Sequence, residues 1–301
     1  MRSSPRLITF AIPFERGIPI LARSIKSILN QRDTSWQAFV YDTGTEEGIE
    51  TVVKSFGQGR VRYVRAPTDR GIGASYNGCL ELAETDLVSI LDADGELRPN
   101  YCEVMRDAST RYPDAAAVFC RAEIMDAQGG PTRSVPDFIK DVLINPALRR
   151  EITLEGEEGV HALLKGNFIV AATLCFRKSV LRERRFREDC KIVLVRDLTT
   201  RLLLDGEQLV GLPERGYRYR GHNETASAKH AFTEQWFKEE FAYYDWMYAE
   251  SMKRGWARCA ELADRRSILK LNVAYRALKN LTLLDLADVR RGLRLFRRSR
   301  R

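Results

Sequence analysis

The chain has 301 residues, of which 44% are hydrophobic and 30% are charged. This balance is typical of a globular protein and excludes a disordered or fibrous one. No segment approaches the roughly 20 apolar residues that a membrane span needs. The apolar start at 7–14 stops at Glu15 without a small-residue cleavage site, so we expect no signal peptide. The length suits one large domain, alone or with a substantial appendage.

The net charge of +8 is concentrated at the C-terminal end. Residues 253–301 hold 15 lysines and arginines against 4 acidic residues, and the rest of the chain is slightly negative. A nucleic-acid surface over the main body is therefore disfavoured, and we expect no nucleic-acid partner. The six cysteines lie far apart without a C-x-x-C pair, which favours free thiols in a reducing cytoplasm over zinc or disulfides.

Strand-like runs alternate with helical segments in the first third of the chain. The expected strands are 7–12, 38–41, 61–64 and 87–91. The helices expected between them are 18–30, 46–56 and 71–84. This alternation predicts an α/β fold with βαβ units and a mainly parallel, twisted sheet. Ligands of such sheets bind beyond the carboxyl ends of the strands.

The pattern is weaker in the second half of the chain. Residues 123–159 contain glycines and prolines typical of an irregular connection. A strand is expected at 168–176, a helix at 194–205 and a short strand at 217–220. From 231 onward the sequence is helical in character to its end. The strongest functional signals therefore follow the strands of the first half.

The sharpest of these signals is Asp92-x-Asp94, which directly follows the apolar run 87–91. Two carboxylates two residues apart on a turn can hold a hard divalent cation and leave positions for phosphate oxygens. An Asp-x-Asp triplet by itself is common and is usually a solvated turn. Its place at the end of a buried strand favours a metal site.

Eight segments, in this order and at ordinary spacing, resemble a family 2 glycosyltransferase with the GT-A fold. They span about residues 5–225 and include the Asp-x-Asp turn. They are the opening strand with Pro13, ARSIKSILNQ (22–31), YDTGT (41–45), DRGIGASYNGCLELA (69–83), LVSILDADGEL (87–97), KGNFIVAATLCFRKSVL (165–181), VRDLTTRLLLDG (195–206) and YRYRGHNETAS (217–227).

The resemblance implies an inverting transfer of a sugar from a nucleoside-diphosphate sugar, with a UDP-sugar as the default donor, to an acceptor hydroxyl. By matching position, Asp94 would ligate Mn²⁺ or Mg²⁺, and Asp92 would hold the ribose or assist the metal. His222 matches a histidine that is a further metal ligand in some members. A surface or packing role for His222 is an equal alternative. The metal would neutralise the diphosphate leaving group.

The donor-side residues follow from the same comparison. Asp42 occupies the acidic position near the nucleoside base, Arg70 matches a residue usually near the donor, and Pro13 belongs to the same pocket. Thr43 stands where members commonly have a second acid. Phe14-Glu15 replaces the usual Thr-Tyr, so recognition of the base is expected to differ.

The general base implied by the resemblance is Asp197, at the start of the helix expected at 194–205. A base must take the acceptor's proton as the anomeric carbon is attacked. A carboxylate in a first helical turn can instead simply stabilise the helix dipole. Arg196 replaces the family's common Glu, and a cation beside Asp197 would lower its pKa. Glu188 and Asp189 are the reserve candidates.

The resemblance also implies a domain organisation: a glycosyltransferase domain at 1–228 and a helical extension at 229–301. The nucleotide part of that domain would cover about 1–120 and the acceptor part about 121–228. A nucleotidyltransferase is a second hypothesis, although the loop after the first strand lacks the Gly-rich, basic pattern of that class. A catalytically silent binding module of the same fold is the third. No G-x-G-x-x-G follows the first strand, which disfavours a dehydrogenase.

The acceptor is left open as a glycan, a lipid-linked molecule or a small molecule, in keeping with bacterial glycan or glycoconjugate biosynthesis. The last residues, 289–301, combine seven arginines with three large apolar side chains and no acid. They predict either a solvated terminus or attachment to an anionic membrane surface. We therefore expect a cytoplasmic protein that could contact the inner membrane face.

Overall fold

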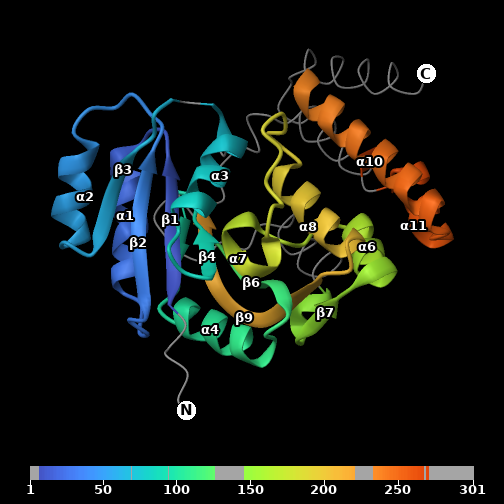
Figure 1. Ribbon diagram of the computed structural model, residues 1–301, viewed down its shortest axis with the longest axis horizontal. Helices are drawn as coiled ribbons and strands as arrows, with labels where there is room; N and C mark the ends of the chain where they lie inside the picture. Colours follow the sequence, from blue (N-terminus) through green and yellow to red (C-terminus); the bar gives the residue numbers. More distant parts are fainter. Residues whose placement is uncertain are drawn as a thin grey trace.

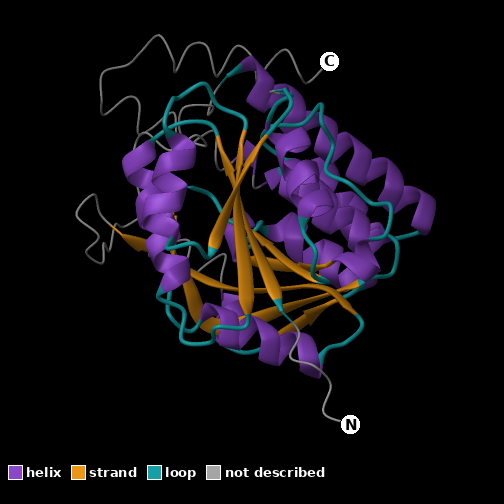
Figure 2. Cartoon of the chain, turned by 60° about the vertical axis from the view of Figure 1, so that its left-hand side comes forward, coloured by secondary structure: helices purple, strands orange, loops and turns teal. Residues whose placement is uncertain are grey.

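The computed structural model describes residues 7–68, 70–93, 95–125, 146–220, 233–267 and 269–270. Within these ranges, a mixed nine-stranded sheet is covered by helices on both faces (Figures 1 and 2). The strand order is β3-β2-β1-β4-β8-β6-β9-β5, and β7 also pairs with β9.

The first half of the fold agrees with the sequence pattern. Four parallel strands are formed by β1 (Ile8–Phe14), β2 (Trp36–Asp42), β3 (Val61–Arg65) and β4 (Leu87–Ile90). The helices between them are α1 (Ile18–Leu29), α2 (Ile49–Gly57) and α3 (Ile72–Leu82). Because these strands are parallel, their carboxyl ends lie along one edge of the sheet.

The second half adds antiparallel pairs, so the expectation of a mainly parallel sheet holds for the first half alone. Its strands are β5 (Gly95–Leu97), β6 (Ala115–Met125), β7 (Ile152–Leu154), β8 (Leu174–Arg177) and β9 (Gln208–Arg220). Strand β8 pairs antiparallel with both β4 and β6. Strand β9 runs parallel to β6 and antiparallel to β5 and β7.

Helices α4 (Tyr101–Arg111), α6 (Gly156–Lys165), α7 (Lys178–Leu181) and α8 (Leu194–Leu204) connect these strands, with short 3-10 turns at Pro146–Arg149 and Ala171–Thr173. The described ends of the segment 123–159 are regular rather than irregular. The strand expected at 168–176 begins only at Leu174. Most of the apolar run 168–176 is buried, and burial alone does not distinguish a strand from a turn.

Two apolar clusters cover the two faces of the sheet. On one face, α1, α2 and α4 pack over buried residues of β1 and β2, such as Phe10 and Val40. On the other face, α3, α6 and α8 pack over residues such as Phe39 and Phe119. Adjacent strand residues alternate between the two clusters, as the period of two of a β-strand requires.

Helices α10 (Glu234–Arg254) and α11 (Ala257–Arg265) belong to the second of these clusters. Buried aromatic residues of α10, among them Trp236, Phe241 and Tyr244, lie in the same core as α6 and α8. The division of the chain at residue 228 stays a prediction, but these two helices share the core of the preceding domain. In the described part of the chain, no helix is both long enough and apolar enough to cross a membrane.

Candidate active site

Asp42 is the last residue of β2, and it is fully buried. Its Oδ1 accepts the Gly44 N–H at 2.9 Å, and its Oδ2 accepts the Tyr63 hydroxyl at 2.8 Å and the Arg65 guanidinium at 2.6 Å. The hydrogen bond to Asp42 raises the pKa of Arg65. Asp42 therefore organises the ends of β2 and β3, and the half-exposed Arg65 lies over it.

The ends of β1 and β2 are tied together next to Asp42. Thr43 donates its N–H at 2.8 Å and its hydroxyl at 3.2 Å to the carbonyl of Phe14. Pro13 pairs in register with Tyr41 and lies beyond the last pair of β1 with β4, Ala11 with Ile90. Thr43, at the position where the family commonly has a second acid, thus connects two strand ends.

Asp92 follows β4 and is held by α3, which covers the face of the sheet opposite α1 and α2. Its Oδ1 accepts the hydroxyl of Tyr76, a buried residue of α3, at 3.0 Å. The predicted metal ligands Asp94 and His222 lie outside the described residues. In the described ranges, no group of three or more His, Cys, Asp or Glu side chains forms a metal site. The carboxylate of Asp92 has the oxygen chemistry that a hard divalent cation prefers.

Helix α3 fastens a loop of the second half to this edge. The side chain of Asn77 donates to the Phe186 carbonyl and accepts the Phe186 N–H, both at 2.9 Å. A Cβ at Gly73 would lie 2.4 Å from the Arg187 carbonyl oxygen, so only glycine permits this approach. The ring of Phe186 also packs edge-on against Tyr76, with centroids 5.2 Å apart. The loop after α7 is thereby fixed against the Gly-rich start of α3.

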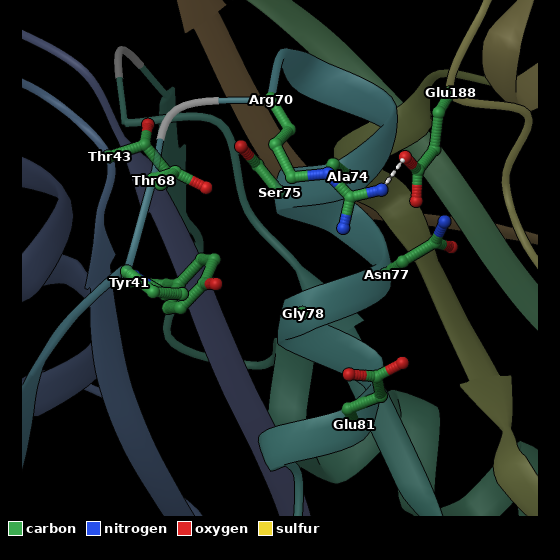
Figure 3. Close-up of a pocket in the computed structure, with 11 residues that line it drawn as sticks. Tyr41, Thr43, Thr68, Arg70, Ala74, Ser75, Asn77, Gly78, Glu81 and Glu188 are labelled. Atoms are coloured by element: carbon green, nitrogen blue, oxygen red, sulfur yellow. Dashed lines mark hydrogen bonds and ion pairs between the residues drawn. The ribbon is translucent and has the colours of Figure 1, made fainter.

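Arg70 and Glu188 meet above the first turn of α3. The guanidinium of Arg70 donates to Glu188 at 2.6 Å, as the dashed line in Figure 3 shows, and both side chains are exposed to solvent. A small pocket opens beside this ion pair, with hydroxyl groups from several elements around it. Its lining includes Tyr41, Thr43, Thr68, Ser75 and Arg70. The predicted donor residue Arg70 and the reserve base Glu188 are thus partners.

Asp197 lies in the first turn of α8 and is 3% exposed. Its Oδ2 accepts the Arg201 Nε at 2.8 Å, and its Oδ1 lies 3.8 Å from Arg187 Nη1. Arg187 also binds Asp189 through two nitrogens, and this hydrogen bonding lowers the pKa of Asp189. Asp189 is therefore a weaker base than an ordinary aspartate.

The cation beside Asp197 is not Arg196, contrary to the expectation from adjacency in sequence. Arg196 turns toward α10, where it donates to Glu240 at 2.6 Å and stacks on the ring of Tyr243 at 4.2 Å. Successive helical residues point about 100° apart, so neighbours in sequence do not face each other. Arg201, four residues after Asp197, occupies the adjacent helix position and could have been found by that spacing.

The turn after β4 is also fixed from the second half of the fold. Gly95 opens β5, which pairs with the end of β9. A Cβ at Gly95 would lie 1.6 Å from the Tyr217 hydroxyl oxygen and 2.1 Å from its ring. Tyr217, which is buried, thus occupies the space of a missing side chain. The sequence placed both residues in family segments but assigned neither a role.

Known proteins resemble this chain in sequence profile and in fold. The sequence profile described as "Glycosyl transferase family 2" matches residues 9–185. The chain is 26% identical over 106 residues to WcaA of Escherichia coli K12, named as a colanic acid biosynthesis glycosyl transferase. This match covers 35% of the chain and 38% of that relative, well under two thirds of its length.

Solved structures share the fold. TarS 1–349 of S. aureus has a TM-score of 0.61 at 13% identity, covering 86% of this chain and 71% of TarS 1–349. Its complex with UDP-GlcNAc has a TM-score of 0.57 at 15% identity, covering 81% and 65%. The mannosyltransferase PcManGT of Pyrobaculum calidifontis, in complex with GDP-Man and Mn²⁺, has a TM-score of 0.60 at 14% identity, covering 99% and 88%. At these identities the likeness concerns the fold.

Proposed function

This chain belongs to glycosyl transferase family 2, and we propose that it transfers a sugar, with inversion, from a nucleoside-diphosphate sugar to an acceptor hydroxyl. Two proteins of similar fold were solved with such donors, UDP-GlcNAc in TarS and GDP-Man in PcManGT. A UDP-sugar is the default donor. The family match also disfavours the nucleotidyltransferase hypothesis.

The observation that carries the proposal is a chain of contacts from Asp92 to Asp197. Asp92 accepts from Tyr76, and the ring of Tyr76 packs on Phe186. The next residue, Arg187, reaches Asp197. Two acids that are far apart in sequence are thus connected through the side chains of Tyr76 and Phe186 and the adjacent Arg187. This arrangement supports a donor site at the strand ends beside an acceptor site at the start of α8.

In this proposal the donor side and the acceptor side of the site use different residues. Pro13, Asp42 and Arg70 shape the donor side, and Asp92 and Asp94, with His222, would hold a divalent metal ion. When bound, Mn²⁺ or Mg²⁺ would supply positive charge for the diphosphate leaving group. Asp197 would accept the proton of the acceptor hydroxyl while the acceptor oxygen attacks the anomeric carbon on the side opposite the departing diphosphate. Arg201 would hold the Asp197 carboxylate in a fixed orientation.

The proposal is tested by separating catalysis from donor binding at Asp197. Asp197→Asn preserves size but removes the proton acceptor, so transfer should fall by roughly 10²–10⁴-fold. Donor affinity, measured by calorimetry with Mn²⁺, should change little because Asp197 is not on the donor side. Asp197→Ala should in addition lower the melting temperature, because it removes the partner of Arg201.

Near-normal turnover of Asp197→Asn would remove this residue from the mechanism. Glu188→Gln and Asp189→Asn serve as matched variants in the same assay. If one of them loses turnover and Asp197→Asn does not, the base is the reserve candidate. If neither reserve variant loses turnover and Asp197→Asn does, the assignment to Asp197 is supported.

The acceptor is proposed by class alone, as a glycan, a lipid-linked molecule or a small molecule carrying a hydroxyl. Residues 289–301 lie outside the described part of the chain. Their seven arginines support contact with an anionic membrane surface, which would suit a lipid-linked acceptor.

A further inference from the structure

A buried carboxylate of α10 covers the backbone that leads into α8. Glu239 is 7% exposed. Its two oxygens accept the N–H groups of Lys191 at 3.0 Å, Ile192 at 2.7 Å and Val193 at 3.2 Å. Gln235, one turn earlier in α10, donates its side-chain amide to Glu239 at 2.7 Å. One side chain therefore satisfies three consecutive backbone donors from a distant part of the chain.

These three donors precede a helix that lacks a cap of its own. The N-cap residue of α8, Val193, has no side chain that could accept from the first turn. Unpaired N–H groups at a helix start are costly when buried, and a carboxylate there also interacts favourably with the helix dipole. A local N-cap side chain would accept from the second or third residue of the helix; Glu239 instead anchors the entry to α8, through the N–H of the N-cap residue Val193 and those of the two residues before it.

The segment held by Glu239 is directly joined to the proposed base. The N–H of Asp197 donates to the Val193 carbonyl at 2.7 Å. Glu239 therefore accepts the N–H of Val193, and the carbonyl of the same residue accepts the N–H of Asp197 in the first turn of α8. A shift of the segment 191–193 would move the carboxylate of Asp197 with it.

Neighbouring contacts fix the rotation of α8 about its axis. Arg196 donates to Glu240, and the Thr200 hydroxyl bonds the Tyr243 hydroxyl at 2.8 Å. Positions 196 and 200 are one turn apart and lie on the same side of α8. With that side turned to α10, Asp197 and Arg201 face the loop that carries Arg187.

We propose that Glu239 is a positioning residue for the acceptor side of the active site: it holds the segment 191–193 and thereby sets where α8 presents Asp197. This inference rests on the proposed role of Asp197. Glu239 has no contact with Pro13, Asp42, Arg70 or Asp92 among its described hydrogen bonds. Its loss should therefore affect the rate of transfer and leave donor binding intact.

The test compares Glu239→Ala and Glu239→Gln with Asp245→Asn. Asp245 is an exposed carboxylate of the same helix, and it pairs with Arg266, the C-cap residue of α11. Glu239→Ala should lower kcat by about 10²-fold, the scale of a catalytic group displaced by about 1 Å. Glu239→Gln, which keeps one acceptor oxygen, should retain more activity, and Asp245→Asn should resemble the wild type. The Kd for UDP with Mn²⁺ should agree within about twofold in all four proteins.

Amide hydrogen exchange gives a readout that is independent of activity. The N–H groups of residues 191–193 should exchange faster in Glu239→Ala and keep their protection in Asp245→Asn. An unchanged kcat in folded Glu239→Ala would overturn the proposal. A weakening of UDP binding in parallel with kcat would overturn it as well, because that result indicates a general structural role. If Glu239→Ala does not fold, the same criteria apply to Glu239→Gln.

The double variant Glu239→Ala/Asp197→Asn separates this inference from the proposed function. If Glu239 acts through Asp197, the second substitution should cost far less than it does alone. If Asp197→Asn is active and Glu239→Ala is not, the proposed base is wrong. If Asp197→Asn is inactive and Glu239→Ala is normal, the base stands and the positioning role is wrong.

Discussion

The amide side chain of Asn77 makes both hydrogen bonds of the Phe186 backbone, at 2.9 Å each, across 109 residues of sequence. Asn77 and Phe186 are both buried. The amide thus pairs with one residue of the loop as a neighbouring strand would. Because Phe186 precedes Arg187 and Glu188, this pair sets the position of the loop that reaches both Arg70 and Asp197.

We expect Asn77→Ala to destabilise the protein and to reduce transfer. The substitution leaves a buried N–H and a buried carbonyl without partners, at a cost of roughly 1–3 kcal/mol for each group. Urea denaturation should show the loss as a lower midpoint with an unchanged slope. Asn77→Asp should also be destabilised, because a carboxylate oxygen would then face the Phe186 carbonyl. Wild-type stability in both variants would contradict this role.

Gly95→Ala should disturb the turn after β4 through its contact with Tyr217. The new methyl group would require Tyr217 or the β5–β9 pairing to move, and overpacking of a core costs about 1–3 kcal/mol. The midpoint temperature of thermal unfolding and the Mn²⁺-dependent affinity for UDP should both fall. Gly206→Asn is the control, because Gly206 has a φ of +84° with open space around it, a conformation that Asn tolerates. Equal stability of Gly95→Ala and the wild type would refute the clash.

Removal of divalent metal should stop transfer. Added EDTA should abolish activity, and Mn²⁺ or Mg²⁺ in excess should restore it, because an uncompensated diphosphate is a poor leaving group. Asp94→Ala should mimic EDTA and weaken UDP binding in the presence of Mn²⁺ without a large change in melting temperature. Full activity in EDTA would show that this enzyme works without a metal.

The basic C-terminal segment should bind anionic vesicles at low salt. Each basic residue near an anionic lipid surface contributes about 1 kcal/mol. Cosedimentation of the full chain with phosphatidylserine vesicles should therefore exceed that of a variant lacking 289–301, and phosphatidylcholine vesicles should retain neither. Added salt should release the protein. Equal behaviour of the two proteins on phosphatidylserine would leave the segment as a solvated terminus.

The sequence by itself determined the family of the chain and the alternation of strands and helices as far as β4. These features depend on local periodicity and on motifs such as Asp92-x-Asp94, which are legible along the chain. It also predicted that Asp42 and Asp92 lie at the carboxyl ends of strands and that Asp197 lies in the first turn of a helix. The order of the first elements required no knowledge of long-range contacts.

Only the tertiary structure decided which side chains act together. Asn77 meets Phe186, Glu239 holds the segment before α8, and Arg201 rather than Arg196 holds Asp197. The tertiary structure also decided the mixed pairing in the second half of the sheet, because antiparallel pairing joins strands from distant segments. The physical reason is that hydrogen bonds and close packing act over a few ångströms in space, whereas periodicity reports only the neighbours within one helix or strand.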